Sequence, residues 1–214
     1  MKQLIFKTTS WKHRFSHGGE LRKLRAGRKA RSLSSKDPIH LVMKANRETI
    51  RGGFRSYKRY FLIQKLVRIY SKRFFIKIEQ VSIQGDHVHL LIRISRRSLC
   101  HSFLRVLSGQ IAQQFQDQGL TAFNAVEKKD KYLPKSTSLK EEKAVTDTPK
   151  HRSRMRLWKY RPFTQVVKGY RAYRTVRDYI SLNEAEALGV ISYLETRLRG
   201  LPENQLQALR KLSG

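Results

Sequence analysis

The sequence predicts an α+β protein built on a ferredoxin-like (RRM-like) antiparallel sheet. Two observations predict this fold. Apolar residues alternate at the period of a strand in some segments and recur at helical spacing in others. The segments also follow one another in the order strand, helix, strand, strand, helix, strand. In that arrangement two helices cover one face of the sheet, and here a further helix follows the last strand.

The hydrophobic pattern places each element in order. The predicted strands cover residues 38–45, 76–83, 87–94 and 157–168, and the predicted helices cover residues 54–75, 95–117 and 170–188. Gly85 and Asp86 provide the turn of a hairpin between the second and third strands. Pro162 has no backbone N–H, so it restricts the last strand to an edge or a bulge. The helix over 54–75 has an apolar stripe that includes Tyr57 and Phe61, and we expect this stripe in the core.

Three divisions of the chain follow from this pattern. Residues 1–37 are rich in Lys, Arg, Ser and Gly and have no apolar period, so they form a basic arm rather than part of the core. Residues 38–188 form the folded domain, with a polar insert at about 120–154. Residues 189–214 form a C-terminal tail with a short helix over 201–212.

The composition points to a polyanionic partner. The 46 Lys and Arg residues exceed the 16 Asp and Glu residues and give a formal net charge of +30, which favours binding to nucleic acid. No apolar run is long enough to cross a membrane, and the first residues lack the apolar core of a signal peptide, so we expect a cytoplasmic protein. Cys100 is the only cysteine, which excludes an internal disulfide and a Cys-based zinc site. It lies in a helical pattern and is expected to fill the core.

Two histidines begin the third strand. His87 and His89 are separated by one residue, so both side chains point to one face of the sheet. A rise of about 3.3 Å per residue sets them about 7 Å apart, with room for one ion between the rings. The alternative is that both are half-solvated or hydrogen-bonded to the backbone.

Two polar residues share a face of the helix after the last strand. Tyr179 and Asn183 are four residues apart, so they project one turn from each other. The alternative for Tyr179 is a half-buried aromatic at the flank of the helix.

Together these motifs resemble the single-tyrosine HUH transposases, and most closely their REP-associated branch, which is linked to repetitive extragenic palindromes. The matching stretches are His87-Val88-His89-Leu90-Leu91, Trp158 with Val166-Val167, Tyr179-Ile180-Ser181-Leu182-Asn183, His17-Gly18-Gly19 and Pro38-Ile39-His40-Leu41-Val42. The sequence departs from the relatives at Pro162-Phe163-Thr164, where they often carry an aromatic pair followed by an acid, and its insert is long.

The resemblance implies a metal-dependent enzyme that cleaves and rejoins single-stranded DNA at hairpins. Tyr179 would be the nucleophile and would form a 5'-phosphotyrosine intermediate, while His87, His89 and Asn183 would bind Mg²⁺ or Mn²⁺. The basic arm would contact the DNA through Arg14, His17, Arg22, Arg25, Arg28 and Arg31. Such a protein would act on the bacterial nucleoid, as a monomer or a homodimer.

Two alternatives remain at this point. The first is a domesticated DNA-binding protein of the same fold that recognises palindromic repeats without cleaving them. The second is an RRM-like RNA-binding protein, which would be expected to expose paired aromatic residues on its central strands.

Overall fold

The computed structural model describes residues 15–19, 30–50, 52–121, 156–191 and 207. In chain order its elements are β1 (Ser16–His17), β2 (Ile39–Lys44), the 3-10 helix η1 (Arg47–Thr49), α3 (Tyr57–Arg73), β3 (Ile76–Ile83), β4 (His87–Ile94), α4 (Arg97–Asp117), β5 (Phe163–Val166) and α5 (Tyr170–Ala187). Nearly all of the helix predicted over 201–212 and nearly all of the predicted insert lie outside the described residues, and residue 207, which is described, is helical.

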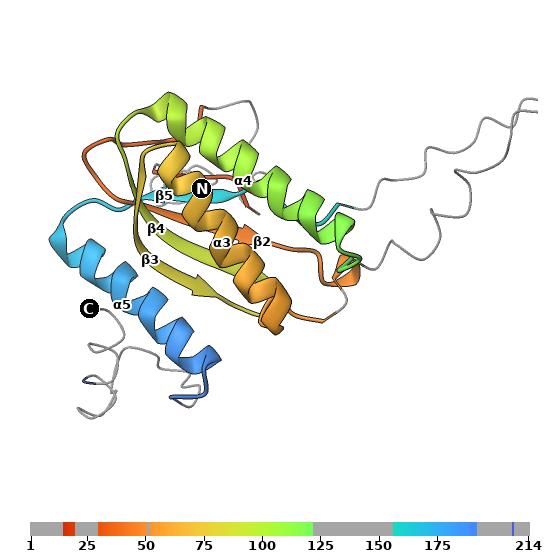
Figure 1. Ribbon diagram of the computed structural model, residues 1–214. Coiled ribbons are helices and arrows are strands. Elements are labelled where there is room, and N and C mark those ends of the chain that lie inside the picture. The colour runs from red at the N-terminus through yellow and green to blue at the C-terminus, as the bar shows by residue number, and fades with distance from the viewer. Residues whose placement is uncertain (1–14, 20–29, 51, 122–155, 192–206, 208–214) are drawn as a thin grey trace, which may run out of the picture.

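The described strands form one antiparallel sheet in the spatial order β1-β5-β2-β4-β3. Apart from β1, this is the order of a ferredoxin-like sheet, in which the first strand lies between the third and the fourth. Helices α3 and α4 lie side by side across one face of the sheet (Figure 1). The predicted fold class is therefore confirmed.

The main core lies between the sheet and these two helices. Alternate residues of β4, beginning with Val88 and Leu90, point into it and are fully buried. Phe54, Phe103 and Phe115 are the largest of the fully buried side chains, and the rings of Phe54 and Phe115 meet edge to face with centroids 5.5 Å apart. None of the described helices is long and apolar enough to cross a membrane.

Part of the apolar stripe predicted for α3 lies outside this core. Ile63, Leu66 and Val67 are buried as a helix-packing face requires, but Tyr57 is 79% exposed and Phe61 is 51% exposed. These two rings contact each other, with centroids 4.6 Å apart, as residues one turn apart on a helix do. Helical spacing identified the helix but assigned too wide a stripe to its buried face.

An irregularity in β3 explains the uneven spacing of its apolar residues. The register against β4 shifts between Ile78 and Gln80, so one extra residue reverses the alternation of side chains at that point. As a result Ile76 and Ile78 before the shift, and Val81 and Ile83 after it, all contact the helix-covered core.

Strand β5 is shorter than predicted and does not lie at the edge of the sheet. It pairs with β2 on one side and with β1 on the other. Pro162 comes directly before the strand, so its missing N–H does not interrupt a ladder. The prediction that Pro162 restricts the strand to an edge or a bulge is wrong, because Pro162 lies outside the strand and two residues from the segment predicted as an arm occupy the outer position.

A second piece of that segment also packs on the domain. Leu33 is buried in the main core.

Gly18, which follows β1, approaches the backbone before β5 closely. It has a φ of 85°, and a Cβ at this position would collide with the carbonyl oxygen of Pro162, so only glycine permits this approach. Gly18 therefore allows β1 to pack closely against the residue that precedes β5.

Candidate active site

The two histidines of the His-x-His motif lie on the sheet face opposite to α3 and α4. Val88, between them, is fully buried in the main core, so His87 and His89 point the other way. Their ring centroids are 4.8 Å apart and the ring planes are nearly perpendicular, at 79°. The rings lie closer to each other than the backbone rise of about 7 Å over two residues suggests.

A third histidine, His40 of β2, joins this pair. In the register of β2 against β4, Val42 lies opposite His89 and His40 lies opposite Leu91, which makes His40 a diagonal neighbour of His89 on the same face. Nε2 of His40 is 3.0 Å from Nδ1 of His89. The two rings are stacked, with centroids 5.3 Å apart and planes at 14°.

Sequence reasoning did not identify His40 as a site residue. The sequence placed it in the matching stretch Pro38-Ile39-His40-Leu41-Val42 without giving it a role. It stands between Ile39 and Leu41, which are both fully buried in the main core, so alternation turns it to the other face. Its contact with His89 depends on the pairing of β2 with β4 and on the register between them, which this pattern does not contain.

The carboxylate of Asp86 connects His87 to the end of β2. Its Oδ1 lies 2.6 Å from Nδ1 of His87, and its Oδ2 accepts a hydrogen bond from Nε of Arg47 at 2.8 Å. The backbone oxygen of Asp86 also accepts from the N–H of Ala45 at 2.8 Å. These contacts fix Asp86, which is 8% exposed, in the turn that precedes the first histidine.

The surroundings set the charge of two of these groups. Burial lowers the pKa of His40 to about 4, because a charged imidazole loses its hydration there. This ring is neutral at pH 7. Burial alone would raise the pKa of Asp86, but hydrogen bonds from His87 and Arg47 outweigh it and leave that pKa below its usual value. Asp86 is therefore an acceptor at neutral pH.

Helix α5 brings a tyrosine to the histidines. Gly169, with a φ of 82°, lets the chain turn after β5, and Leu91, Val167 and Ile180 then form a second apolar cluster that Tyr179 packs against. Leu91 alternates with the core-facing Leu90, so this cluster lies on the histidine face. Tyr179 is the predicted nucleophile, and α5 thus places it on the same face as His87 and His89.

The Tyr179 ring meets two of the histidines edge to face. Its centroid is 5.6 Å from that of His89, with the planes at 87°, and 6.4 Å from that of His40, with the planes at 76°. Tyr179 is half-buried, as the alternative reading of a flanking aromatic also required. Its neighbours, however, are imidazoles rather than aliphatic core residues alone.

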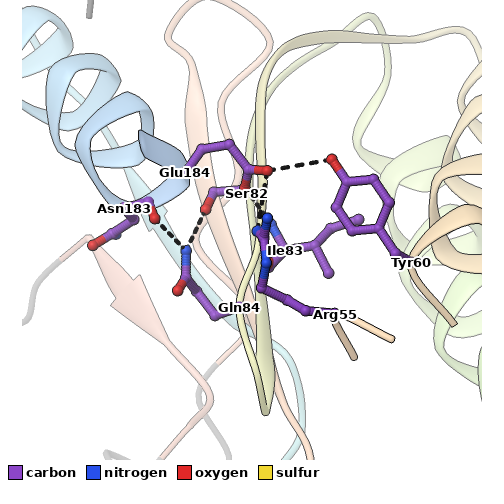
Figure 2. Close-up of polar contacts among 7 residues, drawn as sticks. All are labelled: Arg55, Tyr60, Ser82, Ile83, Gln84, Asn183 and Glu184. Carbon is purple, nitrogen blue, oxygen red and sulfur yellow. Dashed lines mark hydrogen bonds and ion pairs between the residues drawn. The ribbon is translucent and has the colours of Figure 1, made fainter. Parts of the chain in front are cut away.

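Asn183 lies one turn further along α5 and is 5% exposed. Its backbone oxygen accepts a hydrogen bond from Nε2 of Gln84 at 2.7 Å, and the same nitrogen lies 2.7 Å from Oγ of Ser82 (Figure 2). Gln84 comes directly before the turn that leads into β4. The predicted metal ligand is therefore fixed beside the hairpin that carries the two histidines.

Glu184, the next residue, anchors α5 to two other elements. Its Oε2 accepts from the backbone N–H of Ile83 at 3.0 Å, and its Oε1 accepts from Arg55 and from the hydroxyl of Tyr60, each at 3.2 Å. Figure 2 shows the three donors converging on the carboxylate. The sequence pattern did not single out Glu184, because its partners come from distant segments.

The structure describes only two of the predicted DNA contacts. His17 lies in β1, opposite Thr164. Arg31 donates to the backbone oxygen of Pro162 at 2.8 Å and to Oγ1 of Thr164 at 2.9 Å, and burial lowers its pKa below the usual value. Both residues are thus held against β5. The other predicted contacts, Arg14, Arg22, Arg25 and Arg28, lie outside the described residues.

The donor types restrict what kind of metal site this face can form. In the described ranges, no group of three or more His, Cys, Asp and Glu side chains is arranged to hold a metal ion. A site of three side chains in these ranges therefore needs a ligand of another type, and the predicted set of His87, His89 and Asn183 includes an amide.

Known proteins give three further findings. No curated protein matches the chain. The solved REP-associated tyrosine transposase bound to a REP hairpin is 13% identical, with 75% of this chain and 74% of that chain covered and a TM-score of 0.48. A candidate transposase from Deinococcus radiodurans R1 is 14% identical, with 74% and 98% covered and a TM-score of 0.39. Likeness at this level does not carry an activity from one protein to another.

The third finding concerns the family. The family described as "Transposase IS200 like" matches residues 35–133, a range that begins before β2, runs through α4 and includes His40, Asp86, His87 and His89. The matched range is just under half of the chain, and over this range the chain is similar to the IS200-like transposases.

Proposed function

We propose that this protein cleaves and rejoins single-stranded DNA through a covalent bond to Tyr179. The observation that carries the proposal is the position of the Tyr179 ring, 5.6 Å from that of His89, on a sheet face where His87 and His40 also lie. A hydroxyl nucleophile beside a cluster of possible metal ligands is an arrangement that supports metal-assisted phosphoryl transfer to a tyrosine.

In the proposed step, the hydroxyl oxygen of Tyr179 attacks a backbone phosphorus of the DNA. A bond forms between that oxygen and phosphorus, and the bond from phosphorus to the 3' oxygen breaks. The phenol proton leaves to solvent and the departing 3' oxygen takes up a proton, so the products are a 5'-phosphotyrosine and a free 3' hydroxyl. Attack by another 3' hydroxyl reverses the step and rejoins the strand without ATP.

His87, His89 and Asn183 would hold a divalent ion, Mg²⁺ or Mn²⁺, during this step. The contacts of the two histidines support this proposal, because Nδ1 of each imidazole already contacts another side chain, so each would bind the ion through Nε2. When bound, the ion polarises the scissile phosphate and favours the phenolate. Tyr179 supplies the nucleophile, and α5 orients it.

The proposed substrate is a DNA hairpin of the REP type. The formal net charge of +30 favours strong and salt-sensitive contact with phosphates. The motifs that the chain shares with the REP-associated branch point to palindromic repeats, and the basic residues of the arm would read the flank of the hairpin. Such a protein would act on the nucleoid, in the cytoplasm.

The RRM-like alternative is less favoured. RNA-binding proteins of that type stack bases on aromatic side chains of the central strands. Here the central strands β2 and β4 carry no Phe, Tyr or Trp, and α5 packs over the same face. The other alternative is a domesticated protein that binds hairpins without cutting them. It has the same fold, so an experiment must distinguish it from the proposed enzyme.

The test uses labelled single-stranded hairpin DNA from the genomic neighbourhood of the gene, incubated with the protein and Mg²⁺ or Mn²⁺ and separated on a denaturing gel. The wild type should give a metal-dependent covalent band, and Tyr179→Phe should lose it while still binding DNA under native conditions. Tyr173→Phe is the matched control, because it removes a hydroxyl from the same helix, and it should keep the band.

Two results would contradict the proposal. Native binding without a covalent band under any ion would leave a binding protein of the same fold. A covalent band that persists in Tyr179→Phe would move the nucleophile to another residue.

A further inference from the structure

Each histidine of the His-x-His motif contacts a buried side chain through its Nδ1 atom. Nδ1 of His87 lies 2.6 Å from Oδ1 of Asp86, and Nδ1 of His89 lies 3.0 Å from Nε2 of His40. Asp86 and His40 are each 8% exposed. The same ring nitrogen is engaged in both histidines, although the two partners come from different parts of the sheet.

We propose that Asp86 and His40 are positioning residues that hold His87 and His89 in the tautomer with the proton on Nδ1. The lone pair on Nε2 of each ring would then be ready for a divalent ion before the ion arrives. This inference rests on the proposed function, which makes the two histidines metal ligands. It assigns roles to two further residues that do not themselves touch the ion.

The contact with Asp86 fixes the proton on His87. An ionised carboxylate offers only acceptors, so a ring nitrogen 2.6 Å away must carry the proton that lies between them. Arg47 donates to the other carboxylate oxygen at 2.8 Å, which keeps the carboxylate ionised and in place. A carboxylate bound to the second nitrogen of a metal-ligating histidine is a common arrangement around bound metals.

The contact with His40 has two possible directions, and they have opposite consequences. If His40 donates, the proton of a neutral His89 sits on Nε2 and blocks the ion. If His89 donates from Nδ1, Nε2 can bind the ion and His40 acts as the acceptor. The pairing of β2 with β4 holds the two imidazoles in this contact, with their planes at 14°, so the tautomers of the two rings decide the direction.

The first experiment reads the tautomers in the metal-free protein. Long-range proton–nitrogen NMR at about pH 8, where an ordinary imidazole is neutral, distinguishes a protonated ring nitrogen from one with a lone pair. We expect both His87 and His89 to be protonated at Nδ1. A proton on Nε2 of His89 would overturn the role of His40, and a proton on Nε2 of His87 would overturn that of Asp86.

The second experiment measures Mn²⁺ binding by calorimetry without DNA. His40→Phe keeps a ring in the stack but removes the acceptor, and should weaken Mn²⁺ binding by about 10- to 100-fold. His40→Gln restores an acceptor oxygen and should recover most of the affinity. Asp86→Ala should weaken binding over the same range.

Val42→Ala is the matched control, because Val42 lies on the same strand opposite His89 and makes no polar side-chain contact. It should bind Mn²⁺ as the wild type does. Wild-type affinity in His40→Phe, or a loss in Val42→Ala as large as in His40→Phe, would overturn the inference.

These readouts are separate from DNA cleavage. Failure of the proposed function would appear as the absence of a Tyr179-dependent covalent band even though the tautomers and Mn²⁺ affinities are as expected. Failure of the inference alone would appear as a covalent band in a protein whose histidines are protonated at Nε2.

Discussion

Cys100 illustrates, at the scale of one residue, how burial alone sets the chemistry of a side chain. It is fully buried on the face of α4 that packs in the main core, as its place in the helical pattern predicted. Burial raises the pKa of its thiol from 9.0 to about 11, and Arg31 offsets part of this effect. A thiol in this position is protonated at neutral pH and is a poor nucleophile.

The raised pKa predicts a loss of stability at high pH. The thiol of the unfolded chain ionises above about pH 9, while the thiol of the folded protein stays protonated up to about pH 11. Between these values ionisation favours the unfolded chain. The contribution of Cys100 to the free energy of unfolding is therefore fully present below about pH 9 and is lost as the pH rises to about 11. Two pH units correspond to at most about 3 kcal/mol. Urea unfolding at about pH 8 and about pH 10.5 should show a larger fall for the wild type than for Cys100→Ala, and equal falls would contradict this account.

The site residues differ in how far sequence reveals them. His87 and His89 share a strand, and Tyr179 and Asn183 share a helix, so the local periods of two and of 3.6 residues place each pair on one face. The contact of His40 with His89 arises across two strands. No local period contains it, because it is set by the register of the sheet.

At the scale of elements, the position of α5 depends on both apolar and polar contacts. Ile180 packs against Leu91 and Val167, and Glu184 accepts hydrogen bonds from Ile83, Arg55 and Tyr60. The apolar contacts are not directional, whereas the carboxylate requires its donors at fixed positions. We therefore assign to Glu184 the rotation and register of α5 on the sheet.

Glu184→Gln should reduce both stability and the rate of covalent capture. The glutamine amide has one acceptor oxygen and no charge, so the hydrogen bonds that the Glu184 carboxylate accepts are lost or weakened. The expected cost is about 1–3 kcal/mol in the free energy of unfolding. Urea unfolding and the covalent-band assay measure the two effects.

Asp178→Asn provides the matched control for this change. It makes the same substitution on the same helix, but the ion pair of Asp178 is with its neighbour Arg177 and is partly exposed. Its effect on the free energy of unfolding should be below about 1 kcal/mol. If both variants cost the same, the anchoring role of Glu184 is wrong.

At the scale of the whole molecule, α5 packs against the sheet of its own chain. The apolar cluster and the Glu184 contacts together hold Tyr179 beside His89 without a second copy. We therefore predict that, in the proposed cleavage, Tyr179 serves the histidines of its own chain.

Mixing two inactive variants tests this implication. Tyr179→Phe lacks the nucleophile and His89→Ala lacks a proposed ligand, so neither should form the covalent band alone. Their mixture should remain inactive if Tyr179 serves the histidines of its own chain. Size tags on the two variants show which chain is labelled. A covalent band on the His89→Ala chain in the mixture would instead demonstrate that Tyr179 acts across a dimer.

The sequence by itself determined the order of strands and helices, the sheet that this order implies, and the faces shared by His87 with His89 and by Tyr179 with Asn183. These follow from side-chain period and turn chemistry, which are local properties of the chain. Only the tertiary structure decided that β1 covers β5, that His40 and Asp86 contact the two histidines, and that Glu184 holds α5. Except for that between the adjacent residues Asp86 and His87, these contacts join segments far apart in the chain, and register and packing set them rather than any local pattern.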